Sequence, residues 1–64
     1  MSEREERFER MLAEIQAEYA AIEHKMAALR AEGKTKTATF RQLMGNKLMY
    51  QSMLTMYQDH GLIE

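Results

Sequence analysis

The chain has 64 residues and a formal net charge of −1, and it contains neither Cys nor Pro. The absence of Cys excludes disulfides and thiolate metal sites. A net charge so close to zero gives no indication of binding to nucleic acid or to a membrane. A hydrophobic fraction of 45% also excludes a disordered composition. A core of this size contributes only about 3–5 kcal/mol. A small chain that has seven Met residues and no disulfide or thiolate-bound metal is therefore expected to self-associate.

A first helix is predicted over about residues 3–31. Ser2 and Glu5 form a capping box, and acidic residues suit the first turn of a helix. Apolar residues then alternate at spacings of four and three, which is a heptad seam. The seam comprises Phe8, Leu12, Ile15, Tyr19, Ile22, Met26 and Leu29. Two charge pairs at i,i+4 spacing support the helix start: Glu3–Arg7 and Glu6–Arg10.

A polar turn over about residues 32–38 leads to a second helix over about residues 39–60. Gly33 supplies the left-handed position that ends the first helix. Thr39 and Gln42 form a second capping box. At the far end, Gly61 followed by Leu62 predicts a Schellman ending with Leu62 folded back on Met56 or Tyr57.

In the second helix the seam spacings alternate as three and four, the reverse order of the first helix. This seam comprises Phe40, Leu43, Lys47, Tyr50, Leu54, Tyr57 and Gly61. One antiparallel register pairs every seam position, with residue numbers that sum to 69, such as Leu29 with Phe40. The sequence therefore predicts an all-α fold in which residues 1–64 form a single antiparallel two-helix hairpin. We expect this hairpin to self-associate into a four-helix bundle, most simply as a homodimer.

The second helix carries more apolar residues than one seam requires. Met49, Met53 and Met56 form a second stripe, and Met44 and Leu48 lie on the other flank of the seam. A helix that is apolar nearly all round is buried on several sides, so these five residues are the predicted oligomer interface. The alternative is that the Met side chains only fill gaps in the hairpin core.

Charge is distributed unevenly along the chain. Residues 25–47 carry a balance of +5 and the remaining residues a balance of −6, so the turn end is basic and the open end acidic. Hairpins packed head-to-tail would place unlike ends together. The candidate contacts for an anion or a nucleic acid lie around the turn, and they are Arg30, Lys34, Lys36 and Arg41.

Several smaller features remain open between a structural and a functional interpretation. Lys47 occupies a seam position, and its ammonium group is expected to reach water, Glu18 or Glu23. Asn46 either fixes the register of an oligomer or lies on plain surface. A row of Ala on the first helix reflects either helix propensity or close helix packing, and it comprises Ala13, Ala17, Ala20, Ala27 and Ala31.

Chemical motifs are not recognised. The run Gly33–Thr35 lacks the earlier glycine and the strand of a phosphate-binding loop. Glu14 and Glu18 share a helix face, but no Glu-x-x-His motif accompanies them, and His24 and His60 lie at different levels. We therefore expect no enzyme activity, catalytic residue, metal or cofactor.

Two function classes follow from these patterns. The first is a small oligomeric protein that acts as a protein-interaction or regulatory module. The alternative is a four-helix-bundle dimer that binds RNA through the basic turn end, although no aromatic platform accompanies the basic residues there. The charged N-terminal residues and the short apolar runs predict no export or membrane segment, so a cytoplasmic location is expected.

Overall fold

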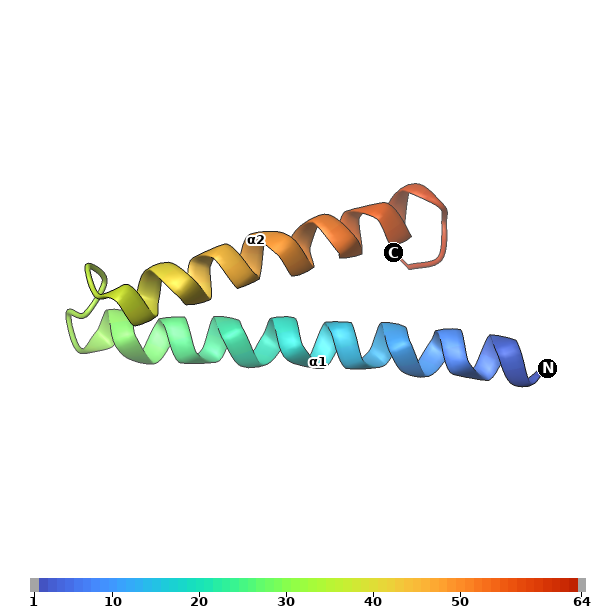
Figure 1. Cartoon of the computed structure of the whole chain (residues 1–64), viewed down its shortest axis with the longest axis horizontal. Helices are drawn as coiled ribbons and strands as arrows, with labels where there is room; N and C mark the ends of the chain where they lie inside the picture. The colour runs from blue at the N-terminus through green and yellow to red at the C-terminus, as the bar shows by residue number, and fades with distance from the viewer. Residues whose placement is uncertain (1, 64) are drawn as a thin grey trace.

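The computed structural model describes residues 2–63 and contains two α-helices in antiparallel arrangement (Figure 1). Helix α1 spans Glu3–Ala31 and helix α2 spans Ala38–Asp59. The hairpin is elongated, with principal extents of 47 × 19 × 18 Å. The predicted all-α hairpin is confirmed, and each helix boundary lies within one residue of its predicted position.

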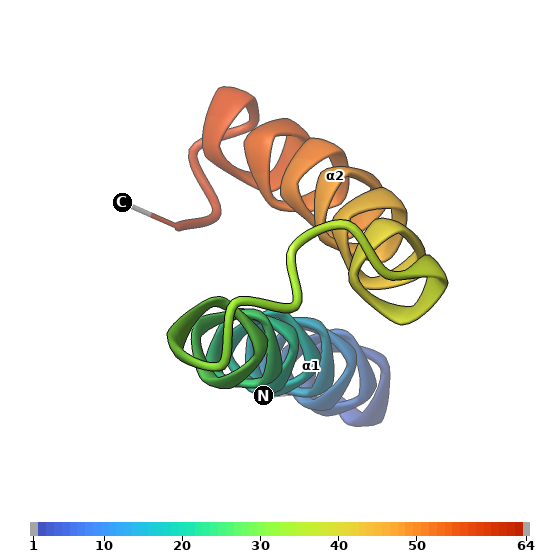
Figure 2. The same cartoon turned by 90° about the vertical axis from the view of Figure 1, so that its left-hand side faces the viewer.

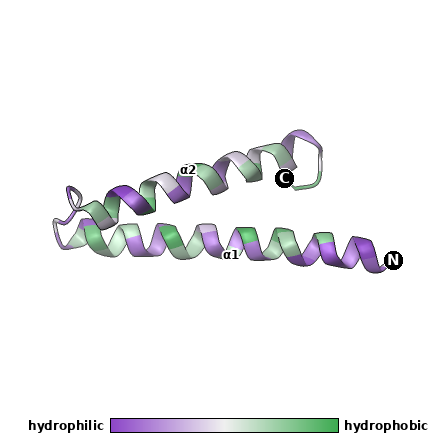
Figure 3. Ribbon diagram, in the orientation of Figure 1, coloured by the Kyte–Doolittle hydropathy of each residue, from purple (hydrophilic) through white to green (hydrophobic). Residues whose placement is uncertain are grey.

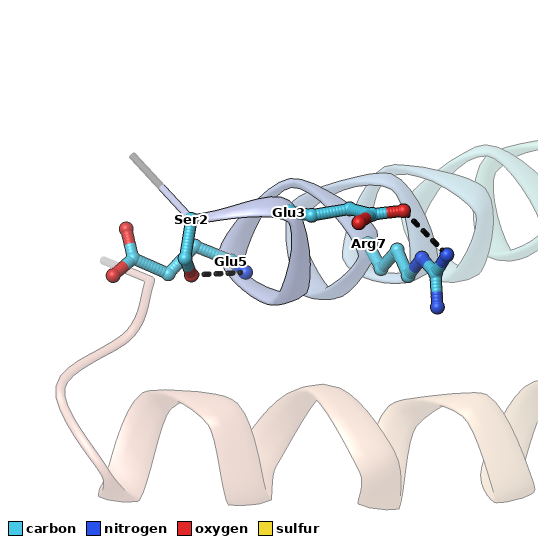
Figure 4. A network of polar contacts seen from close by, with 4 residues as sticks. All are labelled: Ser2, Glu3, Glu5 and Arg7. Atoms are coloured by element: carbon cyan, nitrogen blue, oxygen red, sulfur yellow. Dashed lines mark hydrogen bonds and ion pairs between the residues drawn. The ribbon is translucent and has the colours of Figure 1, made fainter.

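Helix α1 begins with the predicted cap. The Ser2 side chain accepts a hydrogen bond of 3.2 Å from the backbone N–H of Glu5, and Arg7 pairs with Glu3 at 2.6 Å (Figure 4). These contacts satisfy one free N–H group of the first turn and add a weak surface ion pair. The other predicted pair, Glu6–Arg10, does not form within residues 2–63. Both side chains remain solvated, as is common for surface charges.

Helix α1 ends in a Schellman motif. Gly33 has a φ of 72°, its N–H donates to the Arg30 carbonyl at 3.0 Å, and the Lys34 N–H donates to the Leu29 carbonyl at 2.8 Å. These two bonds satisfy carbonyl groups that the helix itself leaves free. The left-handed backbone at Gly33 therefore redirects the chain toward α2.

The cap of α2 is Thr37, and the prediction of Thr39 is wrong. The Thr37 side chain accepts from the Phe40 N–H at 3.2 Å and donates to the Lys34 carbonyl at 3.1 Å. Thr37 therefore joins the turn to the helix through a single hydroxyl group, which Thr39 cannot do from inside the first turn. This early start also brings Phe40 into the core.

Helix α2 ends as predicted. Gly61 also has a φ of 72°, and the Leu62 N–H donates to the Tyr57 carbonyl at 2.9 Å. The chain after α2 turns back across the open end of the hairpin (Figure 1). Leu62 lines one groove with Met56 and Tyr57, and a second groove with Phe8 of α1.

The core follows the predicted seam. Ile15, Ile22, Met26 and Phe40 are buried, and the other seam residues of both helices are half-buried except Phe8 and Gly61. Apolar residues recur as separate bands along α1, whereas its first turns are hydrophilic (Figure 3). Leu29 and Leu43 pack against the cluster of Ile22, Met26 and Phe40, as the predicted register requires at the turn end.

The seam does not stay closed along its whole length. The two helices move apart from the turn toward the open end in both views (Figures 1 and 2). Phe8, the first seam residue, is 54% exposed, so the prediction of a continuous seam is wrong at this end. Bulky Tyr residues occupy the seam in the open half, where α2 diverges. They are Tyr19, Tyr50 and Tyr57.

Candidate interaction surface

Within residues 2–63, the hairpin leaves more large apolar side chains exposed to water than it buries fully. Four of these residues form the buried core, whereas seven large apolar residues are exposed by 44% to 63% of their surface. The exposed residues are Phe8, Met11, Met44, Leu48, Met49, Met56 and Leu62. Four of the five residues predicted for an oligomer interface belong to this set, and Met53 is half-buried.

Residues of both helices combine on one side of the hairpin, which we call the methionine face. Met11 of α1 and Met53 of α2 line the same two grooves, and Met56 lines one of them. Met49 precedes Met53 by one helical turn and so lies on the same side. The methionine face is therefore defined by Met11, Met49, Met53 and Met56.

The divergence of the helices hollows the methionine face. Its first groove encloses about 280 Å³ and is lined almost entirely by apolar side chains, including the buried Ile15 at its base. Among the described residues, His60 and Tyr57 are the ionisable side chains that line this groove. A neighbouring groove of about 480 Å³ adds Glu14 and Glu18 at its margin.

Met44 and Leu48 do not belong to the methionine face. Positions that differ by four residues share a side of a helix, so Met44 and Leu48 form their own strip. A shallow depression beside Leu48 is lined otherwise by the polar residues Gln51, Ser52 and Thr55. The five residues predicted for the interface therefore lie on the two flanks of the seam, as their spacing predicts.

The basic residues of the turn end are partly engaged within the chain. Lys34 pairs with Glu32 at 3.2 Å, and the Arg30 guanidinium lies 5.9 Å from the centre of the Phe40 ring. Lys36 and Arg41 form no ion pair within residues 2–63. Three of the four candidate contacts for an anion are thus free of ion pairs within residues 2–63, and one of these, Arg30, lies over an aromatic ring.

The remaining predicted positions have structural explanations. Lys47 is half-buried in the seam, and its ammonium group reaches Glu23 at 3.8 Å, which confirms one of its expected partners. Asn46 and His24 are exposed. Among residues 2–63, the structure contains no cluster of three or more His, Asp or Glu side chains that could bind a metal ion.

Sequence reasoning missed the contribution of α1 to the exposed apolar surface. Met11 stands directly beside the seam residue Leu12, and this adjacency was the available signal. Leu62 was assigned to helix capping, yet it remains 63% exposed.

Comparison with protein-family models, curated proteins and solved structures finds no match to this chain. Within residues 2–63, neither helix has the length and apolar character that crossing a membrane requires.

Proposed function

We propose that this chain is a self-associating helical hairpin that acts as a protein-interaction or regulatory module. The observation that carries the proposal is the apolar surface described above, because a hairpin that exposes more large apolar residues than it buries invites association. The proposal includes a cytoplasmic location, which the absence of Cys supports.

The total surface area of the hairpin supports the same proposal. The hairpin exposes 5233 Å² to solvent. A compact monomer of 7.5 kDa would expose about 4,200 Å², so the excess is about 1,000 Å² per chain. A standard protein interface removes about 800 Å² from each partner. The excess is therefore large enough to supply one interface without disturbing the hairpin core.

The experiment is sedimentation equilibrium of the wild-type chain combined with circular dichroism over a range of concentrations. We expect a dimer at micromolar concentration and a helical signal that falls on dilution, because association and folding are linked. A folded monomer at micromolar concentration would remove the proposal.

Nucleic-acid binding through the turn end is the competing function. It is favoured only by the unpaired Lys36 and Arg41, since Lys34 and Arg30 already have partners. We expect no mobility shift of RNA or DNA at physiological salt. A shift that falls steeply with salt, and that Lys34→Glu with Lys36→Glu abolishes while the hairpin stays folded, would establish the competing function instead.

A further inference from the structure

Three charged side chains that form no ion pair within residues 2–63 accompany the methionine face. Glu14 and Glu18 border the larger groove beside Met11 and Met53. Lys25 follows Glu18 by two helical turns, so it lies on the same side of α1, about 10 Å nearer the turn. None of these three forms an ion pair within residues 2–63. The face thus carries acidic and basic positions that are displaced along the hairpin axis.

We propose that a second copy of this chain covers the methionine face in head-to-tail orientation. Lys25 of each copy then lies beside Glu14 and Glu18 of the other copy. The inference rests on the proposed self-association, and it adds the face, the orientation and the charge pairs that select them.

A second copy fits this face by symmetry and by area. In a twofold dimer the same surface meets itself, so each contact occurs twice. We place the twofold axis perpendicular to the hairpin, near residues 20–21 of α1. Lys25 of one copy then lies level with the midpoint between Glu14 and Glu18 of the other copy. The contact also closes the apolar grooves, and the excess of about 1,000 Å² per chain matches the area of a standard interface.

Charge excludes the parallel orientation. A parallel dimer through the same face would place Lys25 of one chain opposite Lys25 of the other. Glu14 and Glu18 would likewise lie opposite the same two residues of the second chain. Like charges opposed across an interface cost free energy, whereas complementary charges select the orientation. The charge balances of +5 around the turn and −6 elsewhere act in the same direction over the whole length of the hairpin.

The strip of Met44 and Leu48 is the less suitable surface for this contact. It is bordered by Gln51, Ser52 and Thr55, and the depression beside it is open and partly polar. The methionine face combines a groove lined almost entirely by apolar side chains with complementary charges, so it is the face that we assign to the dimer.

Orientation is measured by the distance between the two turns. The natural chain has no Cys, so Thr35→Cys in the exposed turn accepts a single spin label. In the head-to-tail dimer the two labels lie about 40 Å apart, from the rise of 1.5 Å per residue on either side of the axis. In a parallel dimer both turns lie at one end, within about the 19 Å width of the hairpin. A dimer with the short distance would overturn the orientation while leaving the proposed function in place.

The charge pairs are tested by reversal and restoration. Lys25→Glu alone, or Glu14→Lys with Glu18→Lys, should each weaken the dimer by about tenfold, because two symmetry-related contacts change from attraction to repulsion. Combining all three changes should restore the wild-type dissociation constant. Glu9→Lys is the control, since Glu9 lines the groove on the opposite side of the open end. Reversals that leave the dissociation constant unchanged would contradict the proposed pairs.

The face is tested by a matched pair of neighbouring residues. Met49 and Leu48 are 51% and 58% exposed, so a Glu at either position removes little packing from the hairpin itself. Met49→Glu should abolish the dimer, and Leu48→Glu should leave it intact, as sedimentation would show. If Leu48→Glu dissociates the dimer and Met49→Glu leaves it intact, the choice of face is overturned. A wild-type monomer would instead overturn the proposed function.

Discussion

Phe40→Ala and Phe8→Ala compare the same chemical change at the two ends of the hairpin. Both rings lie on the seam, and each has an Arg guanidinium at similar distance, 5.9 Å for Phe40 and 5.6 Å for Phe8. They differ in burial, because Phe40 is 5% exposed and Phe8 is 54% exposed. A difference in stability between the two variants therefore reports burial rather than the aromatic ring or its cation.

The structure sets the two magnitudes. Phe40 packs in the buried cluster with Ile22 and Met26, so its truncation should cost about 3–5 kcal/mol, the sum of lost transfer and a cavity. Phe8 buries less than half of its surface and leaves no enclosed cavity, so its loss should cost about 1 kcal/mol. Since a domain of this size has about 3–5 kcal/mol of stability, Phe40→Ala should be largely unfolded.

Urea unfolding followed by circular dichroism measures both variants, at one fixed protein concentration because association shifts the equilibrium. Thermal unfolding of Phe8→Ala, followed by the same signal, should give a melting temperature lower by about 4–8 °C. Phe40→Leu and Phe8→Leu repeat the comparison with a smaller truncation, which keeps the difference measurable if Phe40→Ala does not fold. Equal costs at the two positions would refute the reasoning, since the burial of the seam would then not follow the divergence of the helices.

Three further comparisons test local features by the same unfolding assay. Gly33→Ala should cost about 1–2 kcal/mol because of its φ of 72°, whereas Gly45→Ala in open space within α2 should stabilise by about 0.5–1 kcal/mol; a neutral Gly33 variant would contradict the assigned turn. Thr37→Ala should cost about 1 kcal/mol and Thr39→Ala much less, and the reverse order would restore Thr39 as the cap. Lys47→Leu should stabilise the hairpin, because its ion pair of 3.8 Å is weak and its stem already lies in the seam. A loss of stability would show that the ion pair contributes more than a buried Leu side chain would.

The helices and their register could be predicted because each depends on a short repeated pattern. Heptad spacing fixes which side of each helix is apolar. The structure gathers Leu29, Leu43, Met26 and Phe40 in one cluster at the turn end, as the predicted antiparallel register requires. The left-handed Gly33 after α1 and the Schellman ending of α2 were also predictable, since a Gly just beyond the last turn of a helix is a local signal.

The cap of α2 and the open end could not be predicted in the same way. Thr37 and Thr39 both offer a hydroxyl group, and the local pattern favours Thr39 because Gln42 follows it. The choice is decided by the bond from Thr37 back to the Lys34 carbonyl, which depends on the geometry of the turn. Likewise, the heptad pattern assigns Phe8 to the seam but carries no information on how far the two helix axes diverge.

The composition of the methionine face explains why its charges matter. Met is flexible and adapts to differently shaped partners, so an apolar contact built from Met49, Met53 and Met56 supplies affinity with little preference for orientation. Orientation must then come from groups whose positions are displaced along the axis, and on this face those groups are the carboxylates at the groove margin and Lys25. Sulfate screens such exposed charges but, as a kosmotropic salt, strengthens apolar association. A high concentration of sulfate should therefore broaden the distribution of turn-to-turn distances before it dissociates the dimer.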